Sequence, residues 1–403
     1  MDPSYLVKAF FLMLPTFLLG CMLFERWRWA LRLPAAVVFG VLVPLAAAAF
    51  IPGAMDYLVS FCTMACIYAV LSLGLNAQWG YNGHLNFGVA AFFGMGMFTM
   101  ALFVSSAPTG PLAMYAKQLF GLNAPYLVGI IAAAIMAGVL GYLVAQPILH
   151  LRTDFLAIAT LGIAEIVRLV FQNERWLANG PQPFSGIPQP FSCVFKAPRC
   201  GWLPDWFLDA TAVLQPRDYS YLYLIIVVVA LALIYVMLEA MVRSPWGRAL
   251  RAVRDEEMSA AMSGKHVKSL RVQSFVLGCV IMGIAGGLYA PFMVTIDYSH
   301  LNPLFSTFLV WVMLMLGGSG NNKGALLGAF VIWAVWSGTG YVTSGLESAL
   351  SGIAPDIARR MSFLRWAFVG LLLAGIVLYR PQGLLPEKKR VSRFLQGHGV
   401  PEN

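Results

Sequence analysis

The chain has 403 residues, of which 59% are hydrophobic and only 11% are charged. This composition excludes an ordinary soluble protein, because soluble domains cannot hide so much apolar surface from water. The formal net charge is +9. The basic residues stand mostly between and after apolar runs, as the cytoplasmic loops of a membrane protein require, so we do not expect nucleic acid as a partner.

Apolar runs long enough to cross a membrane recur along the whole chain. They occupy residues 5–24, 33–51, 57–76, 84–104, 125–148, 154–172, 221–242, 272–290, 304–317, 324–342 and 362–379. The pattern predicts an all-α fold, a polytopic transmembrane helical bundle of about 10–11 spans. The run at 304–317 is short and the stretch 84–104 is rich in glycine, so a broken or re-entrant helix is the alternative for each.

The same pattern divides the chain into three parts. Residues 1–56 are expected to form N-terminal transmembrane helices, residues 57–379 the main bundle, and residues 380–403 a charged tail. The main bundle includes a long polar loop at 173–220 and a charged segment at 243–271.

Lysine and arginine predict the orientation of the spans. If eleven spans alternate, the basic clusters around Arg28, Arg152 and Lys323, in 243–271 and after Arg380 all lie on one side, which should be the cytoplasm. The N-terminus is then outside and the C-terminal tail is cytoplasmic. Three arginines oppose this assignment: Arg359, Arg360 and Arg365.

The 173–220 loop is external in this arrangement, and its prolines exclude a long helix. We expect a stiff, irregular cap over the outer face. Cys193 and Cys200 both lie in this loop, where an oxidising compartment permits a disulfide that would pin the loop. A pair of free thiols is the alternative.

A polar, glycine-punctuated break interrupts the apolar pattern at residues 76–88. Its amide and imidazole side chains are costly at membrane depth unless they face protein or water. Two interpretations are open, a plain cytoplasmic loop or a break that enters the bundle as a helix joint or as part of a translocation path. The translocation-path candidates are Asn76, Gln78, Asn82, His84 and Asn86.

The charged segment 243–271 is predicted to contain one helix over 244–264. Ser244 suits the N-cap, Pro245 the first helical position and Gly264 the end. One face of this helix carries apolar residues, namely Trp246, Leu250, Val253, Met258 and Ala261.

Arg254 and Glu257 interrupt that face as a predicted i,i+3 ion pair. One interpretation is an amphipathic helix lying on the membrane surface. The other is a helix that docks in a groove of a cytoplasmic partner. The opposite charges within the apolar stripe favour docking, since charged contacts fix geometry in a protein groove.

Two further features lie within the spans. Glu165 and Arg168 stand one helical turn apart, either as a self-neutralised pair or as a gating pair on the substrate path. Small residues recur at helix-packing spacing, which favours close packing, with a moving helix interface as the alternative. These are Gly283 with Gly287, Gly320 with Gly324 and Gly328, and Gly88 with Gly94 and Gly96.

The sequence lacks a Walker phosphate loop, a zinc-protease motif and a serine-hydrolase motif. We therefore expect no enzyme activity, no cofactor and no metal in this chain. An ion-coupled secondary transporter or channel remains the rival class, but it needs buried acids, and the only reasonable candidate, Glu165, has Arg168 beside it.

Three stretches resemble a known family, the permease subunits of branched-chain amino acid ABC importers of the LivM type. The first runs from Leu75 to Gly94, and the second from Leu151 to Gly162. The third runs from Ser244 to Glu257 and is followed by Gly286–Tyr289 and Gly317–Gly318. Together they cover most of residues 57–345.

The resemblance implies the rest of a transport machine in a bacterial inner membrane. Its parts would be a second homologous permease, two cytoplasmic ATPase subunits that bind the ATP, a periplasmic substrate-binding protein and membrane lipid. The expected cargo is branched-chain amino acids, with urea, short amides or small carboxylates as alternatives. The 244–264 helix would couple to an ATPase through Arg248, Arg251, Asp255, Glu256 and Gly264.

The chain departs from the family pattern after this helix, where it reads Ser263-Gly-Lys-His-Val267 in place of a Leu-Gly-Ile-Asn-like run. The external segments 105–124 and 173–220 also look larger than is usual. The departure after the helix is expected to alter local packing and the choice of partner without removing the helix, and the larger external segments affect the expected docking of the binding protein and the expected cargo.

Overall fold

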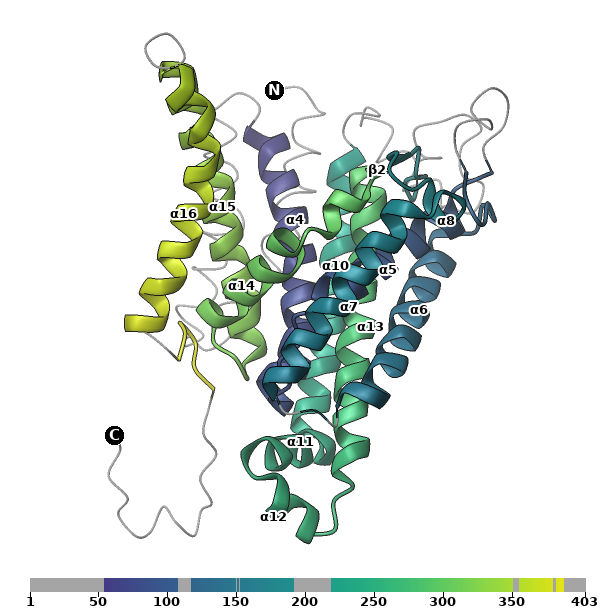
Figure 1. Ribbon diagram of the computed structural model, residues 1–403, viewed down its shortest axis with the longest axis vertical. Helices are drawn as coiled ribbons and strands as arrows, with labels where there is room; N and C mark the ends of the chain where they lie inside the picture. Colours follow the sequence, from purple (N-terminus) through teal and green to yellow (C-terminus); the bar gives the residue numbers. More distant parts are fainter. Residues whose placement is uncertain are drawn as a thin grey trace, which may run out of the picture.

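The computed structural model describes residues 54–107, 117–149, 151, 153–191, 219–350, 355–379 and 382–387. Within them the chain is almost entirely helical, which confirms the all-α fold (Figure 1). The long helices are α4 (Ala54–Leu75), α5 (Val89–Val104), α6 (Tyr126–Ile148), α7 (Thr153–Asn173), α10 (Tyr219–Arg243), α13 (Val267–Met293), α15 (Asn322–Leu350) and α16 (Pro355–Tyr379). The apolar runs predicted at 5–24 and 33–51 lie outside the described residues.

Four described helices are long and apolar enough to cross a membrane: Met55–Gly80, Tyr126–Ile148, Tyr219–Arg243 and Val267–Met293. The apolar helices at Val89–Val104, Leu304–Gly317 and Phe363–Gly375 are shorter. Described helix boundaries differ from the predicted ones by a few residues, because helix ends are fixed by local backbone contacts that hydropathy does not report.

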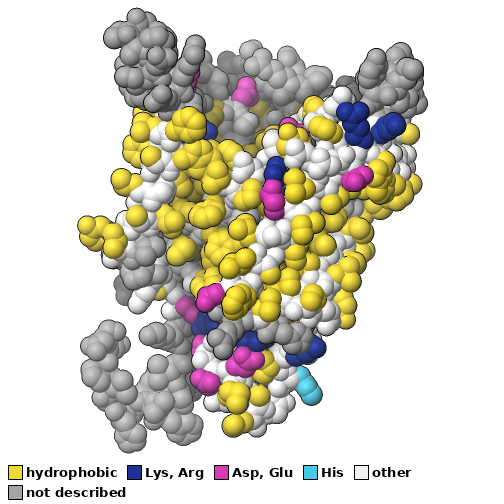
Figure 2. Space-filling view, viewed as in Figure 1, with side chains coloured by type: hydrophobic (Ala, Val, Ile, Leu, Met, Phe, Trp, Pro, Cys, Tyr) yellow, Lys and Arg dark blue, Asp and Glu magenta, His cyan; other side chains and the backbone are white. Residues whose placement is uncertain are grey.

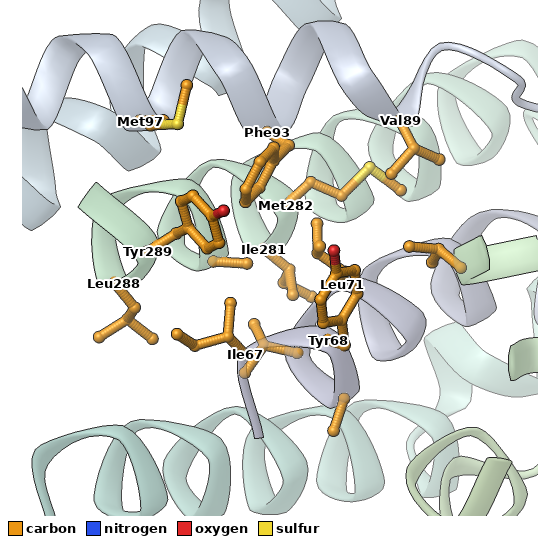
Figure 3. Packing of buried hydrophobic residues seen from close by; sticks show 14 of the residues in the cluster. Ile67, Tyr68, Leu71, Val89, Phe93, Met97, Ile281, Met282, Leu288 and Tyr289 are labelled. Atoms are coloured by element: carbon orange, nitrogen blue, oxygen red, sulfur yellow. The ribbon is translucent and has the colours of Figure 1, made fainter. Parts of the chain in front are cut away.

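Helix α13 lies at the centre of the bundle and packs most extensively against α6 and α5. Figure 3 shows Phe93 of α5 beside Tyr289 of α13, and their rings meet edge to face with centroids 5.2 Å apart. Ile67 and Leu71 of α4 complete this packed layer. Because α5 is apolar all round, it can be covered on nearly every side.

Glycines allow these helices to approach closely. A Cβ at Gly286 would overlap the carbonyl oxygen of Phe93, and a Cβ at Gly96 would overlap the backbone of Gly283. A side chain at either position would therefore force α5 and α13 apart. The predicted role of small residues in close packing is confirmed at Gly96 and Gly283, and Gly286, which was not among the predicted positions, packs in the same way.

The sequence predicts possible irregular helices at 304–317 and 84–104, and the two runs form different structures. The 304–317 run is one continuous short helix, which begins with a π-helical turn at Leu304–Phe308 and continues as α14 (Leu309–Gly317). In the 84–104 run, the helix α5 begins only at Val89, and residues 83–88 form no helix.

The described part of the 173–220 loop contains a single helical turn, α8 (Arg175–Ala178), and the strand β1 (Phe184–Ser185). This strand pairs antiparallel with β2 (Thr295–Ile296), so the loop is tied to the end of α13. The predicted Cys193 and Cys200 pair lies outside the described residues.

The charged elements gather at one end of the bundle. The helices α11 (Pro245–Asp255) and α12 (Glu257–Met262) lie at the lower end in Figure 1, whereas α8, β2 and the start of α4 lie at the upper end. Residues 382–387 return to the lower end, where Leu384 N donates to Leu316 O at 2.8 Å. The predicted common side of the 243–271 segment, Lys323 and the start of the tail is thus confirmed.

Candidate functional site

The polar break at 76–88 is buried inside the bundle. Helix α4 passes into a π-helical turn over Asn76–Gly80, and Gly83, with φ +76°, turns the chain into the non-helical segment before α5. The side chains of all five predicted candidates, Asn76, Gln78, Asn82, His84 and Asn86, are at most 4% exposed. A plain surface loop is therefore excluded, and the break is a helix joint.

Asn76 connects the joint to the start of α15 and, through it, to α10. Its Oδ1 accepts from Gly320 N at 2.9 Å, and its Nδ2 donates to Asn322 Oδ1 at 3.0 Å. Tyr81 also donates to Asn322 Oδ1, at 2.9 Å. Asn322 in turn donates to Glu239 Oε2 of α10 at 3.1 Å. These hydrogen bonds connect α4, α10 and α15, which are distant in the sequence, at this end of the bundle.

Gln78 lies in the first half of the joint. It connects this half to α13 and to the second half of the joint. Its Nε2 donates to Phe275 O at 2.7 Å, and its Oε1 accepts from Asn86 Nδ2 at 2.7 Å. The backbone carbonyl of Asn86 accepts from Trp311 Nε1 at 3.0 Å. Since these buried amides bond to the protein, they hold the helices together at the joint.

His84 is kept neutral in this environment. Burial, reinforced by the nearby charge of Arg271, lowers the pKa of His84 to about 3. Its Nε2 lies 3.4 Å from Asn82 Nδ2. An uncharged imidazole fits the buried joint without a counterion.

We predict that Gln78→Leu destabilises the protein by about 2 kcal/mol. The substitution leaves the buried Nδ2 of Asn86 without its partner and removes the side-chain hydrogen bond to Phe275 O, which costs about 1–3 kcal/mol. Thermal unfolding of the purified protein measures the effect. Gln118→Leu is the control, because Gln118 makes its hydrogen bond to Ser106 O at the surface. Equal melting temperatures for the two variants would contradict the prediction.

The predicted single helix over 244–264 is two helices. Glu256 has an extended backbone, with φ −155° and ψ 106°, and separates α11 from α12. Pro245 begins α11 and Gly264, with φ +77°, follows the end of α12, as predicted. Ser244 occupies the N-cap, but its hydroxyl donates to Met241 O at 2.6 Å and does not cap the helix.

The break changes which side chains share a face. Leu250 and Val253, predicted on a face towards lipid or a partner, are buried within the chain itself, whereas Met258 is 65% exposed and Met262 82% exposed. The predicted Arg254–Glu257 pair is wrong, because the extended residue 256 turns α12 away from α11. Glu257 instead pairs with Arg271 of α13 at 2.6 Å.

Arg254 forms a junction between three parts of the chain. Its Nη1 lies 2.8 Å from Glu387 Oε2 in the tail and also donates to Gly80 O in the helix joint. Burial opposes the charge of this guanidinium, but Glu387 and Asp255 raise the pKa of Arg254 above its usual value. The charged segment is therefore locked both to the joint and to the tail.

Glu387 and Glu239 were not predicted as site residues. Glu387 lies in the part of the chain expected to be a separate tail, and Glu239 lies at the end of an apolar span. Only the fold brings them to a cavity of about 250 Å³ whose lining also includes Tyr81, Arg251 and Asn322.

The predicted coupling residues differ in their surroundings. Arg251 is half-buried and donates to Gly247 O and Val242 O, so it fastens α11 to the end of α10. Arg248, Asp255, Glu256 and Gly264 are exposed. The exposed residues and the two methionines form the free tip of α11 and α12.

Glu165 and Arg168 form the predicted ion pair on α7, with Arg168 Nε 2.9 Å from Glu165 Oε2. Their side chains are 42% and 24% exposed. The pair neutralises itself within one helix, and the gating alternative stays a hypothesis. Among the described residues, no group of three or more histidines, cysteines or acids is placed to hold a metal ion.

Long apolar helices, a buried polar joint and a charged tip at one end define a polytopic membrane protein of the transport type. The model of one protein family, described as branched-chain amino acid transport system / permease component, matches residues 57–377. The chain belongs to this family.

Individual relatives agree with the family. The probable branched-chain amino acid transport permease protein LivM of Methanocaldococcus jannaschii is 28% identical, over 80% of this chain and 91% of that protein. The high-affinity permease protein LivM of Escherichia coli is 27% identical, over 81% of this chain and 70% of its own length. The high-affinity permease protein LivH of Salmonella typhimurium is 21% identical, over 79% of this chain and 94% of that protein. No solved structure matches the chain.

Proposed function

We propose that this chain is the permease subunit of an ATP-driven importer of branched-chain amino acids in a bacterial inner membrane. The observation that carries the proposal is the family match over residues 57–377, together with the LivM proteins of similar length. Urea, short amides and small carboxylates remain alternative cargoes for the same machinery. The chain would form half of the translocation pathway.

The second half would come from a homologous permease. The chain is similar to LivH proteins as well as to LivM proteins, which supports a pair of related subunits. Two cytoplasmic ATPase subunits would bind and hydrolyse the ATP, and a periplasmic protein would deliver the substrate. In this arrangement the end that carries α11 and α12 faces the cytoplasm, the C-terminus is cytoplasmic and the N-terminus is outside.

The free tip of α11 and α12 is suited to contact an ATPase. Met258 and Met262 present flexible apolar side chains, which adapt to a groove on a partner. Asp255, Glu256 and Arg248 surround them with charges of both signs, which fix the orientation of a docked surface. Movement of the tip would reach the buried joint through Arg254, because this residue bonds to Gly80 O.

Uptake into right-side-out or reconstituted vesicles that contain ATP tests the proposed energy source. We expect uptake of leucine, isoleucine or valine to require ATP and to survive collapse of the proton gradient. Uptake that survives ATP depletion and stops when the proton gradient collapses would show an ion-coupled transporter instead.

We predict that the double substitution Asp255→Lys/Glu256→Lys prevents association with the ATPase subunits. The change reverses two exposed charges on the tip, and like-charge contacts at an interface cost several kcal/mol. Co-purification of the ATPase and ATP-dependent uptake are the measurements. Glu174→Lys/Glu347→Lys makes the same change of charge on exposed residues at the opposite end and should leave co-purification of the ATPase intact. Retained co-purification in the first variant would contradict docking by this tip.

A further inference from the structure

A basic groove lies beside the tip, where α6 ends and α13 begins. Its volume is about 750 Å³. Tyr142 and Gln146 line it from α6, and Lys265, Lys268 and Gln273 line it from the start of α13. No carboxylate is among its lining residues, and neither lysine has an ion-pair partner among the described residues. The groove therefore carries uncompensated positive charge.

A second cavity of about 390 Å³ adjoins the first and shares Lys268 with it. Its one acid, Glu257, is neutralised by Arg271 at 2.6 Å. The Nε of Arg271 is buried and has no hydrogen-bond partner in the described part of the chain. Because α13 begins at Val267, the positive end of a 27-residue helix dipole also lies at this place. Lys268 and the helix dipole favour an anion at this place.

The groove lies at the end of an apolar stripe on α6. Five side chains spaced four residues apart are between 48% and 71% exposed, namely Leu127, Ile131, Ile135, Val139 and Leu143. Figure 2 shows this hydrophobic surface ending above a group of basic side chains at the lower end of the molecule. In a membrane such a stripe faces acyl chains, and basic pockets at its end meet the lipid headgroups.

We propose that the groove binds an anionic phospholipid, with the phosphate between Lys265 and Lys268 and the acyl chains along the exposed stripe of α6. Tyr142 and Gln146 lie where the headgroup meets the acyl chains, and they offer hydroxyl and amide groups to the glycerol oxygens. Gln273 accepts from Trp246 Nε1 at 2.9 Å, so the lipid sits beside α11. The inference goes beyond transport and requires only that the bundle lies in a membrane.

Native mass spectrometry of the whole transporter with added phosphatidylglycerol or phosphatidylcholine tests the site. We expect phosphatidylglycerol to bind preferentially. Lys265→Gln/Lys268→Gln should weaken its binding by roughly tenfold or more, since each lysine near a headgroup contributes about a fivefold change in affinity. Lys265→Arg/Lys268→Arg keeps the charge and should retain the lipid. Lys323→Gln removes a charge at the same end but outside the groove, and should change nothing.

Three results would overturn the proposal. Equal binding of phosphatidylcholine would show that the charge of the headgroup is not recognised. Unchanged phosphatidylglycerol binding in the glutamine variant would place the lipid elsewhere. Displacement of the lipid by excess inorganic phosphate would assign the groove to free phosphate. The experiment measures lipid binding, so a negative result would not contradict the proposed transport function. Equally, evidence for a different cargo or energy source would not contradict the lipid site.

Discussion

Arg254→Glu is expected to lower ATP-dependent uptake at least tenfold while the protein still inserts in the membrane. The substitution removes the 2.8 Å ion pair with Glu387 and the hydrogen bond to Gly80 O, and it places a carboxylate beside two acids. Both partners of the pair are about one quarter exposed, so solvent partly screens the pair and the loss of the ion pair itself should cost about 1 kcal/mol. The larger effect is on transport, because the tip loses its connection to the buried joint. Uptake into vesicles measures it.

A charge swap separates a specific contact from a general disturbance. Arg254→Glu/Glu387→Arg restores opposite charges across the same gap, and we expect it to recover a large part of the uptake lost in the single variant. A swap variant as inactive as Arg254→Glu would contradict the junction.

Gly286→Ala is expected to destabilise the bundle by about 3 kcal/mol, near the upper end of the cost of overpacking. The added Cβ would overlap the carbonyl oxygen of Phe93, so α5 and α13 must separate along the packed layer that also holds Tyr289. Backbone cannot move aside as the end of a flexible side chain can. Thermal unfolding of the purified protein measures the loss.

Gly338→Ala is the control for this prediction. A Cβ at Gly338 of α15 meets nothing within 4 Å. Alanine should therefore be neutral there or stabilise the helix by up to about 1 kcal/mol, because it restricts the unfolded chain more than glycine does. Similar melting temperatures for the two alanine variants would show that α5 and α13 are not packed as closely as the structure indicates.

Local sequence features predicted local structure well. Pro245 begins α11 as expected, Gly264 follows the end of α12, and Glu165 pairs with Arg168 one turn away. In each case the cause lies within a few residues, because proline, positive φ and i,i+3 spacing act on neighbouring positions. The extended backbone at Glu256 was missed, since no proline or glycine marks it.

The contacts of the candidate functional site could not be predicted in this way, because the residues that bond to one another there are distant in the sequence. Asn76 and Asn322 are 246 residues apart, and Gln78 is 197 residues from Phe275. Glu257 was expected to pair with Arg254 by spacing, yet Arg271 is its partner. Spacing predicts neighbours on one helix, but contacts between helices depend on how the helices pack.

The sequence alone determined that this protein is an all-α membrane protein, because apolar runs of sufficient length cannot be stable in water and can satisfy their backbone hydrogen bonds only as helices in lipid. It also placed the polar break and the charged segment. The tertiary structure decided that the break is a buried joint, that the tail returns to Arg254 and that two lysines meet an apolar stripe at a groove. These features depend on contacts between segments that are far apart in the sequence, and no local pattern of residue types specifies such contacts.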